Sequence, residues 1–283
     1  MTYADGEFGT VETSLIFPFL ARRAGSSEAT APSRGAFNSS LLAADLSGVS
    51  RLVLGQGLRD TRTALVRWNG KPGPIVRAWL GWSVAVASAL LAAVYAIAVF
   101  SPPDPTPLAV PGVTHAATFS DVGYVLFRNG LVLALHALAC VAGFIAGSSL
   151  PIAAATRHGL SRWVHEKAGP LAILFVGGAT AFSLGTQAIV LGVGTASLSA
   201  QLGISPGVLL LALLPHALPE LAALFLPLAA WLIASRRGEW RELLAATLVT
   251  VAIALPVLVL SAVVETYVSP YLLRALAGVG THT

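Results

Sequence analysis

Two ionisable side chains lie in a strongly apolar part of the chain. His216 and Glu220 occur in LLPHALPELAALFLPLAAW, a stretch otherwise built from leucine, alanine, phenylalanine, proline and a terminal tryptophan. Residues four apart lie on one face of a helix, about one turn from each other. Placing a charged side chain at the centre of a membrane helix costs about 2.5–3.5 kcal/mol on insertion scales. We therefore expect this pair to face a cavity or a polar partner.

Other polar side chains interrupt apolar stretches in the same way. They are Arg128 and Asn129 in LFRNG, His136 in LVLALHALA, and Glu265 in AVVETYVSP. We expect Arg128, Glu265 and the outer half of the span that holds Glu220 to lie toward the outer leaflet, where they can meet. Together with His216 and Glu220, these residues form the predicted intramembrane polar network.

Three interpretations of the network are open from the residues alone. In the first, Glu220 accepts hydrogen bonds from His216, Asn129 or the backbone, and the network fixes how the helices pack. In the second, the network lines a path for a proton, an ion or a small solute, with Glu220 as the titrating group and His216 as its modulator. In the third, His216, Glu220 and His136 bind zinc, although the H-E-x-x-H spacing is absent. No other motif indicates catalysis, a metal or a cofactor, so we predict no enzyme.

The composition predicts an all-α membrane protein. Of the 283 residues, 55% are hydrophobic and only 11% are charged, whereas about a quarter are charged in soluble domains. A membrane helix needs about 20 predominantly apolar residues. Five stretches meet this requirement and predict a bundle of about five spans: 77–100, 122–150, 169–193, 206–235 and 241–267.

The fourth of these spans is too long for one straight crossing. Counting back about 20 residues from SRRGEW reaches His216, so residues 216–235 can cross the membrane alone. Residues 206–214 are then predicted to form a half-helix that enters from outside. We expect Pro215 and Pro219 to mark the break, facing the protein interior, because irregular backbone at membrane depth needs a cover of protein or water.

The distribution of basic residues predicts the orientation. Lysine and arginine are frequent before the first span and in the loops after the second and fourth spans, whereas loops 101–121 and 194–205 have none. Basic residues near span ends stay on the cytoplasmic side. We therefore expect a cytoplasmic (inner) membrane protein with its N-terminus inside and its C-terminus outside. The net charge of +4 then reflects topology and attraction to anionic lipid, and nucleic acid is not an expected partner.

The regions outside the spans have distinct expected roles. Residues 1–38 are predicted to be a flexible cytoplasmic N-terminus, 39–76 an amphipathic juxtamembrane segment, 77–276 the transmembrane domain and 277–283 a short tail. In the juxtamembrane segment we expect an interfacial helix broken by glycine, with an apolar stripe formed in part by Leu58, Leu65 and Trp68. Glycines 55 and 57 are the expected break.

The two longest loops between spans have different expected structures. The outer loop 101–121 is rich in proline and can be a cap over an outer vestibule or a bare connector. The inner loop 151–168 can hold a short interfacial helix. Glycine-rich stretches in the second and third spans favour close helix packing, either within one bundle or in a homo-oligomer.

The segment around His216 resembles the signature of the stage II sporulation protein M family, Pro-His-Gly-x-x-Glu. Pro215, His216 and Glu220 match it in identity and spacing, and Ala217 replaces the glycine. Segments VLFRNGLVLALHALACVAGFIAG and AVVETYVSPYLLRAL are similar to other family spans, and in LGTQAIVLGVG the family's Asn-Gly is Gln187-Ala188. The resemblance covers about residues 77–276.

This resemblance implies a multispan bacterial membrane protein. Relatives in sporulating bacteria act as the membrane scaffold of a peptidoglycan-remodelling complex. It therefore implies a non-enzymatic scaffold that recruits membrane or envelope proteins. The alternative is a transporter, channel or permease subunit that uses the His/Glu network as its path.

Overall fold

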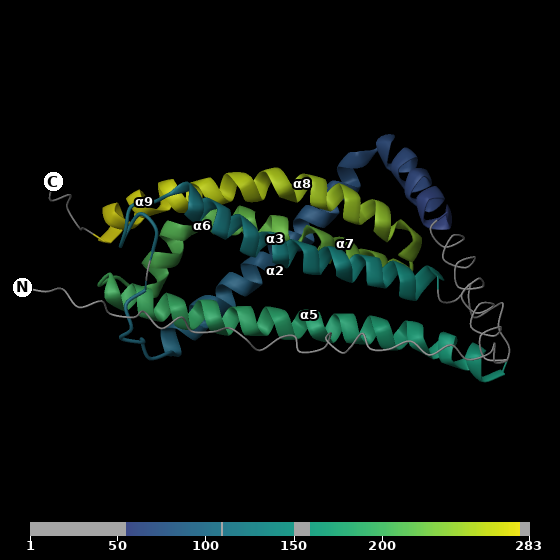
Figure 1. Ribbon diagram of the computed structural model, residues 1–283, viewed down its shortest axis with the longest axis horizontal. Helices are drawn as coiled ribbons and strands as arrows, with labels where there is room; N and C mark the ends of the chain where they lie inside the picture. The colour runs from purple at the N-terminus through teal and green to yellow at the C-terminus, as the bar shows by residue number, and fades with distance from the viewer. Residues whose placement is uncertain (1–54, 109, 150–158, 278–283) are drawn as a thin grey trace, which may run out of the picture. The chain divides into compact units, whose positions relative to one another are not determined.

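The computed structural model describes residues 55–108, 110–149 and 159–277, which are predominantly helical (Figure 1). These residues contain no strand beyond an isolated bridge between Pro111 and His115. The predicted all-α fold is confirmed. The predictions for the flexible N-terminus, the first part of the juxtamembrane segment and most of the C-terminal tail fall outside the described residues.

Five helical stretches among the described residues are long and apolar enough to cross a membrane. They are Pro72–Phe100, Phe119–Ser148, Ile173–Gln201, Pro206–Leu224 and Trp240–Leu276. Each overlaps one of the five predicted spans, so their number and approximate places are confirmed. The chain is a multi-pass membrane protein.

The first two spans begin at clear local signals. α2 (Pro72–Phe100) starts with proline at its first helical position, where the missing N–H has no helical partner to lose. α3 (Phe119–Phe144) starts with a capping box, in which Thr118 and Asp121 each bond the other's backbone N–H. A π-helical turn, Ile145–Ser149, extends α3.

α5 (Gly159–Gln201) is longer than the predicted third span. Its first turns occupy the end of loop 151–168, so the helix expected in that loop is, from Gly159 onward, continuous with the third span. Its last turns occupy most of the predicted outer loop 194–205. The extension is physically reasonable because GTASLSAQ contains small residues that a helix accommodates, although their low hydropathy does not mark them as part of a span.

The fourth span is broken, but not at the predicted prolines. α6 (Pro206–Leu224) continues through Pro215 and Pro219. α7 (Leu226–Arg237) follows after a single non-helical residue, Phe225. Interior prolines remove one backbone hydrogen bond each, yet membrane helices tolerate them where neighbouring helices satisfy the freed groups.

The break occurs at Phe225, where the backbone leaves the helical region and the next residues favour the start of a new helix. The φ of −90° and ψ of 0° at Phe225 leave the helical region, and Pro227 follows in the first turn of α7, where proline is favourable. The last carbonyls of α6 lack helical partners. One of them, on Ala222, accepts a hydrogen bond from the Ser83 hydroxyl of α2.

The last span is one nearly continuous helical stretch. α7 ends at Arg237 and is followed by Gly238, whose φ of 70° is the left-handed conformation that favours glycine. The bounds of the elements that follow are Trp240–Glu242 for a 3₁₀ turn, Leu243–Val263 for α8, Val264–Val268 for a π-helical turn and Ser269–Ala277 for α9. Glu265 therefore lies in the π-helical turn.

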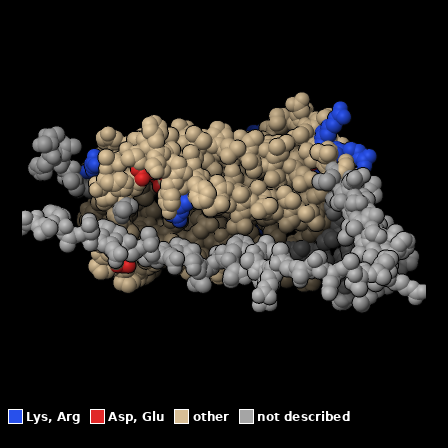
Figure 2. All heavy atoms as spheres, in the orientation of Figure 1, with Lys and Arg blue, Asp and Glu red and all other residues tan. Residues whose placement is uncertain are grey.

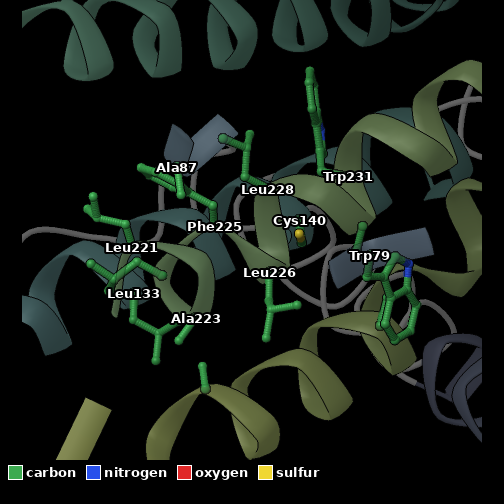
Figure 3. Packing of buried hydrophobic residues seen from close by; sticks show 14 of the residues in the cluster. Trp79, Ala87, Leu133, Cys140, Leu221, Ala223, Phe225, Leu226, Leu228 and Trp231 are labelled. Carbon is green, nitrogen blue, oxygen red and sulfur yellow. The ribbon is translucent and has the colours of Figure 1, made fainter. Parts of the chain in front are cut away.

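The main core forms around the broken span. α6 and α7 contact α2, α3 and α8 (Figure 1). Figure 3 shows the side chains at their junction, where Phe225 and Leu226 pack among Leu133, Cys140 and Leu228. These five side chains are all buried.

The helical residues 55–69 pack against the start of α2, the end of α3 and the start of α8. The rings of Trp68 and Trp79 meet edge to face at 5.3 Å, and Arg67 pairs with Glu242. The helix passes through Gly57, so the predicted break there is wrong. Leu58 of the predicted stripe is 73% exposed, because the buried face is rotated toward Gly57, Ala64 and Trp68.

The two ends of the described bundle differ in character. We call the end formed by residues 101–118 and 202–205 the loop end, and the end formed by residues 64–77 and 236–242 the basic end. Figure 2 shows blue spheres gathered at the basic end, on the right of the view.

Candidate functional site

Asn129 and Glu220 join α3 to α6. The Asn129 amide Nδ2 donates a hydrogen bond to Glu220 Oε1, at 2.8 Å. The other carboxylate oxygen, Oε2, is buried and has no hydrogen-bond partner among the described residues. An unsatisfied buried polar atom costs about 1–3 kcal/mol. One half of the carboxylate is therefore available to a further donor.

His216 has a different partner from Glu220. Its Nδ1 lies 2.7 Å from Ser269 Oγ, and both side chains are buried. This bond joins α6 to the first residue of α9, directly after the π-helical turn that holds Glu265. The described structure contains no hydrogen bond between His216 and Glu220 themselves.

Four of the six predicted network residues line one cavity. Arg128, Asn129, Glu220 and Glu265 all contribute to an open space of about 820 Å³ that is lined by α3, α5, α6, the π-helical turn and residues of the outer loop. In Figure 2, red and blue spheres lie near one another in the loop-end half of the visible face. The expected meeting of Arg128, Glu265 and α6 therefore occurs.

Arg128 lines the cavity without closing an ion pair. Its guanidinium carbon lies 5.7 Å from the centroid of the Tyr124 ring, within the range of a cation–π contact. Among the described residues, it has no carboxylate oxygen within 4.0 Å. Arg128 therefore forms no contact ion pair with Glu220 or Glu265.

His136 does not belong to this cavity. It is buried in the main core, and its ring meets that of Phe225 edge to face with centroids 5.5 Å apart. In the part of the chain that the structure describes, no three potential metal-ligating side chains come together. The predicted inclusion of His136 in one network with His216 and Glu220 is therefore wrong, because α3 turns it toward the α6–α7 break.

α5 supplies polar side chains that the sequence interpretation missed. Ser183, Thr186 and Gln187 line the same cavity as Asn129 and Glu220. Their spacing of three and four residues inside an apolar span is the signal that could have identified them. Ser269, the partner of His216, has no such signal because it follows the predicted last span, 241–267.

The outer loop docks on the loop end of the bundle. The backbone of Asp104 donates to Ser197 Oγ at 2.9 Å, and Gln201 bonds the backbone of Thr106 and Leu108. Hydrogen bonds from Thr106 hold the pKa of the Asp104 carboxyl below its ordinary value. Pro111 and His115 of this loop also line the cavity.

The sequence was also compared with models of known protein families, and one family matches. Residues 162–270 match the model of the stage II sporulation protein M family. The match confirms the family resemblance expected from the His216 and Glu220 motif. Neither the curated proteins nor the solved structures give a match.

The stage II sporulation protein M match is shorter than the predicted resemblance. It includes nearly all of α5, then α6, α7 and α8, and the turn that holds Glu265. It leaves out residues 77–161, and with them Asn129. The intramembrane bond from Asn129 to Glu220 thus joins α3, outside the matched region, to α6 within it.

Proposed function

We propose that the chain is a non-enzymatic membrane scaffold that recruits partner proteins at the cytoplasmic membrane. The family match supports a membrane protein of the stage II sporulation protein M type. The basic end, which carries Lys71 and Arg237, would face the cytoplasm. The partners would be membrane or envelope proteins.

The proposal rests on one observation: polar side chains inside the bundle form hydrogen bonds between different helices. Asn129 bonds Glu220 across α3 and α6, and His216 bonds Ser269 across α6 and α9. Both bonds join helices from distant parts of the sequence. Such bonds fix the packing of a rigid anchor, with energies of about 0.6–2 kcal/mol each in membrane proteins.

The alternative function, a continuous path for a proton, an ion or a solute through the protein, has less support. The cavity at Glu220 and the smaller cavity at the basic end share no lining residue. Between them lie the buried side chains of Phe225, Leu133 and Cys140. This packing favours a scaffold over a transporter, channel or permease subunit.

α5 offers the surface on which a partner would be sought. Only 6% of its membrane-spanning window is buried, against 28% or more for the other four spans. Phe175 and Phe182 are both more than 70% exposed. Lipid also covers such a face, so the experiment must separate a protein partner from lipid.

Photo-crosslinking in native membranes makes this separation. A photoreactive amino acid replaces Phe175 on α5, which does not line the cavity, or, as a matched control, Leu260 on α8, which is 65% exposed. We expect a discrete protein adduct from position 175 and only lipid adducts from position 260. Lipid adducts alone at 175, or an identical protein adduct at both positions, would contradict recruitment through α5.

The substitution Glu220→Gln distinguishes the scaffold function from the transport function. A scaffold predicts a packing defect and loss of partner recovery, because the Asn129 amide loses a charged acceptor. A path predicts intact assembly with lost flux. Normal assembly, normal partner recovery and normal flux together would count against both functions.

A further inference from the structure

The cavity at Glu220 has the size and lining of a ligand pocket. Its volume of about 820 Å³ lies within the range of about 300–1,000 Å³ typical of small-molecule sites. Apolar side chains such as Val132, Phe182 and Leu221 make up most of its wall. The lining also includes polar side chains from α3, α5, α6 and the π-helical turn, and polar groups beside an apolar wall can orient an amphipathic ligand.

The two glutamates of the cavity are incompletely matched by basic groups. Glu220 and Glu265 face one guanidinium, that of Arg128, which lies by the Tyr124 ring instead of pairing with either acid. Asp121, also in the lining, accepts hydrogen bonds from Thr118, and its Oδ1 lies 3.6 Å from His115 Nε2. The buried Glu220 Oε2 is thus the atom that most needs a donor.

The lining selects among classes of ligand. An anion would meet two glutamates beside Arg128, the one arginine of the lining. A bare metal ion needs several close oxygen, nitrogen or sulfur ligands, and the described residues bring no three acidic, histidine or cysteine side chains together. A cationic nitrogen on an apolar body satisfies both the carboxylates and the apolar wall, including the Phe182 ring.

We propose that this cavity binds an amphipathic organic ammonium compound. Its ammonium group donates to Glu220 Oε2 and faces Glu265, and its apolar body packs against Phe182 and Leu221. Asn129 holds the other oxygen of Glu220 and so orients the carboxylate. This small-molecule site goes beyond the scaffold function and does not depend on it.

Three indole compounds with different charges test the proposal. Tryptamine carries an ammonium group, tryptophol a neutral hydroxyl and indole-3-acetate a carboxylate. Equilibrium dialysis measures the Kd of each for the full chain in an uncharged detergent. We expect tryptamine to bind at least about tenfold more tightly than tryptophol, because a hydrogen bond to a charged group contributes about 1.5–3 kcal/mol. Indole-3-acetate should bind most weakly.

Two variants locate the binding. Glu220→Gln should weaken tryptamine binding to the level of tryptophol. Thr186→Phe places bulk in the cavity from α5 and leaves both glutamates intact, so it should weaken all binding. Ala181→Phe is its control, because Ala181 is exposed on α5 and does not line the cavity.

Equal affinity for all three compounds, or no binding of tryptamine, would overturn the proposal. So would tryptamine binding that Thr186→Phe leaves unchanged, a result that decides the matter even if Glu220→Gln does not fold. Bilayer nanodiscs of phosphatidylglycerol, with and without phosphatidylethanolamine, then identify the source of the ammonium group. Competition by phosphatidylethanolamine assigns the site to a lipid headgroup, and its absence assigns the site to a free amine; both results support an ammonium site.

Discussion

A hydrogen bond between two spans contributes most to stability when its acceptor is an ionisable group in the apolar interior. Asn129 donates such a bond, because it is the hydrogen-bond partner of Glu220 among the described residues. Gln187 lines the same cavity, but its amide bonds Ser183 of its own helix, at 3.2 Å. The two amides therefore provide a matched comparison at the scale of single residues.

We expect Asn129→Leu to lower the free energy of unfolding by about 1–3 kcal/mol, because it leaves a buried carboxylate without a donor. Gln187→Leu should change it by less than about 0.5 kcal/mol. Denaturant unfolding in mild detergent measures both values. An equal loss in the two variants would show that the bond between spans has no special role.

Ser269→Ala tests the second bond between spans in the same way. It removes the partner of His216 Nδ1, which is buried, and should cost about 1–3 kcal/mol. Ser235→Ala is the control, because Ser235 bonds only the Leu232 carbonyl of its own helix. The midpoint of thermal unfolding should fall for the first variant and stay near the wild-type value for the second. The reverse order would refute the assignment of the His216 bond.

At the scale of elements, α5 is held to the bundle through close contact with α2. A Cβ atom added at Gly192 would lie 2.6 Å from Ile97 Cβ and 3.1 Å from the Val94 carbonyl oxygen. A Cβ atom added at Gly185, two turns earlier on the same helix, would meet nothing within 4 Å. Glycine at 192 thus permits the close approach of two helices, as small residues do in membranes.

Gly192→Ala should therefore separate α5 from α2 and destabilise the protein by about 1–3 kcal/mol, the usual cost of overpacking. Gly185→Ala should be neutral or stabilising by about 0.4–1 kcal/mol, because alanine restricts the unfolded chain. Protease sensitivity and thermal unfolding in detergent report both effects. Equal stability of the two variants would contradict the close α2–α5 contact.

At the scale of the whole molecule, the basic end and the loop end must lie on opposite sides of the membrane if the spans cross it. Cys140, the only cysteine in the chain, is fully buried. The wild-type protein therefore provides an unreactive background for thiol labelling. Pro105 at the loop end and Glu239 at the basic end are both exposed and suit introduced cysteines.

In intact cells, a membrane-impermeant maleimide should label Pro105→Cys and leave Glu239→Cys unlabelled. Both should react after the membrane is opened with detergent. This result follows from the retention of basic residues on the cytoplasmic side. Labelling of Glu239→Cys alone in intact cells would show that the orientation is inverted.

The sequence alone determined the spans and the presence of buried polar groups. Span length follows from the thickness of the membrane and the rise of a helix, which are local properties of any apolar stretch. The cost of a charge in hydrocarbon likewise indicated that Glu220 and Glu265 need polar surroundings before any fold is known. The place of Asn129 beside Glu220 was among the expected alternatives.

Only the tertiary structure decided which groups meet. His216 bonds Ser269, His136 packs on Phe225, and the fourth span breaks at Phe225 although Pro215 and Pro219 lie inside α6. These outcomes depend on how each helix is rotated and how closely it approaches its neighbours. Close contacts between distant residues, such as that of Gly192 with Ile97, set that arrangement, and no local pattern in the sequence encodes them.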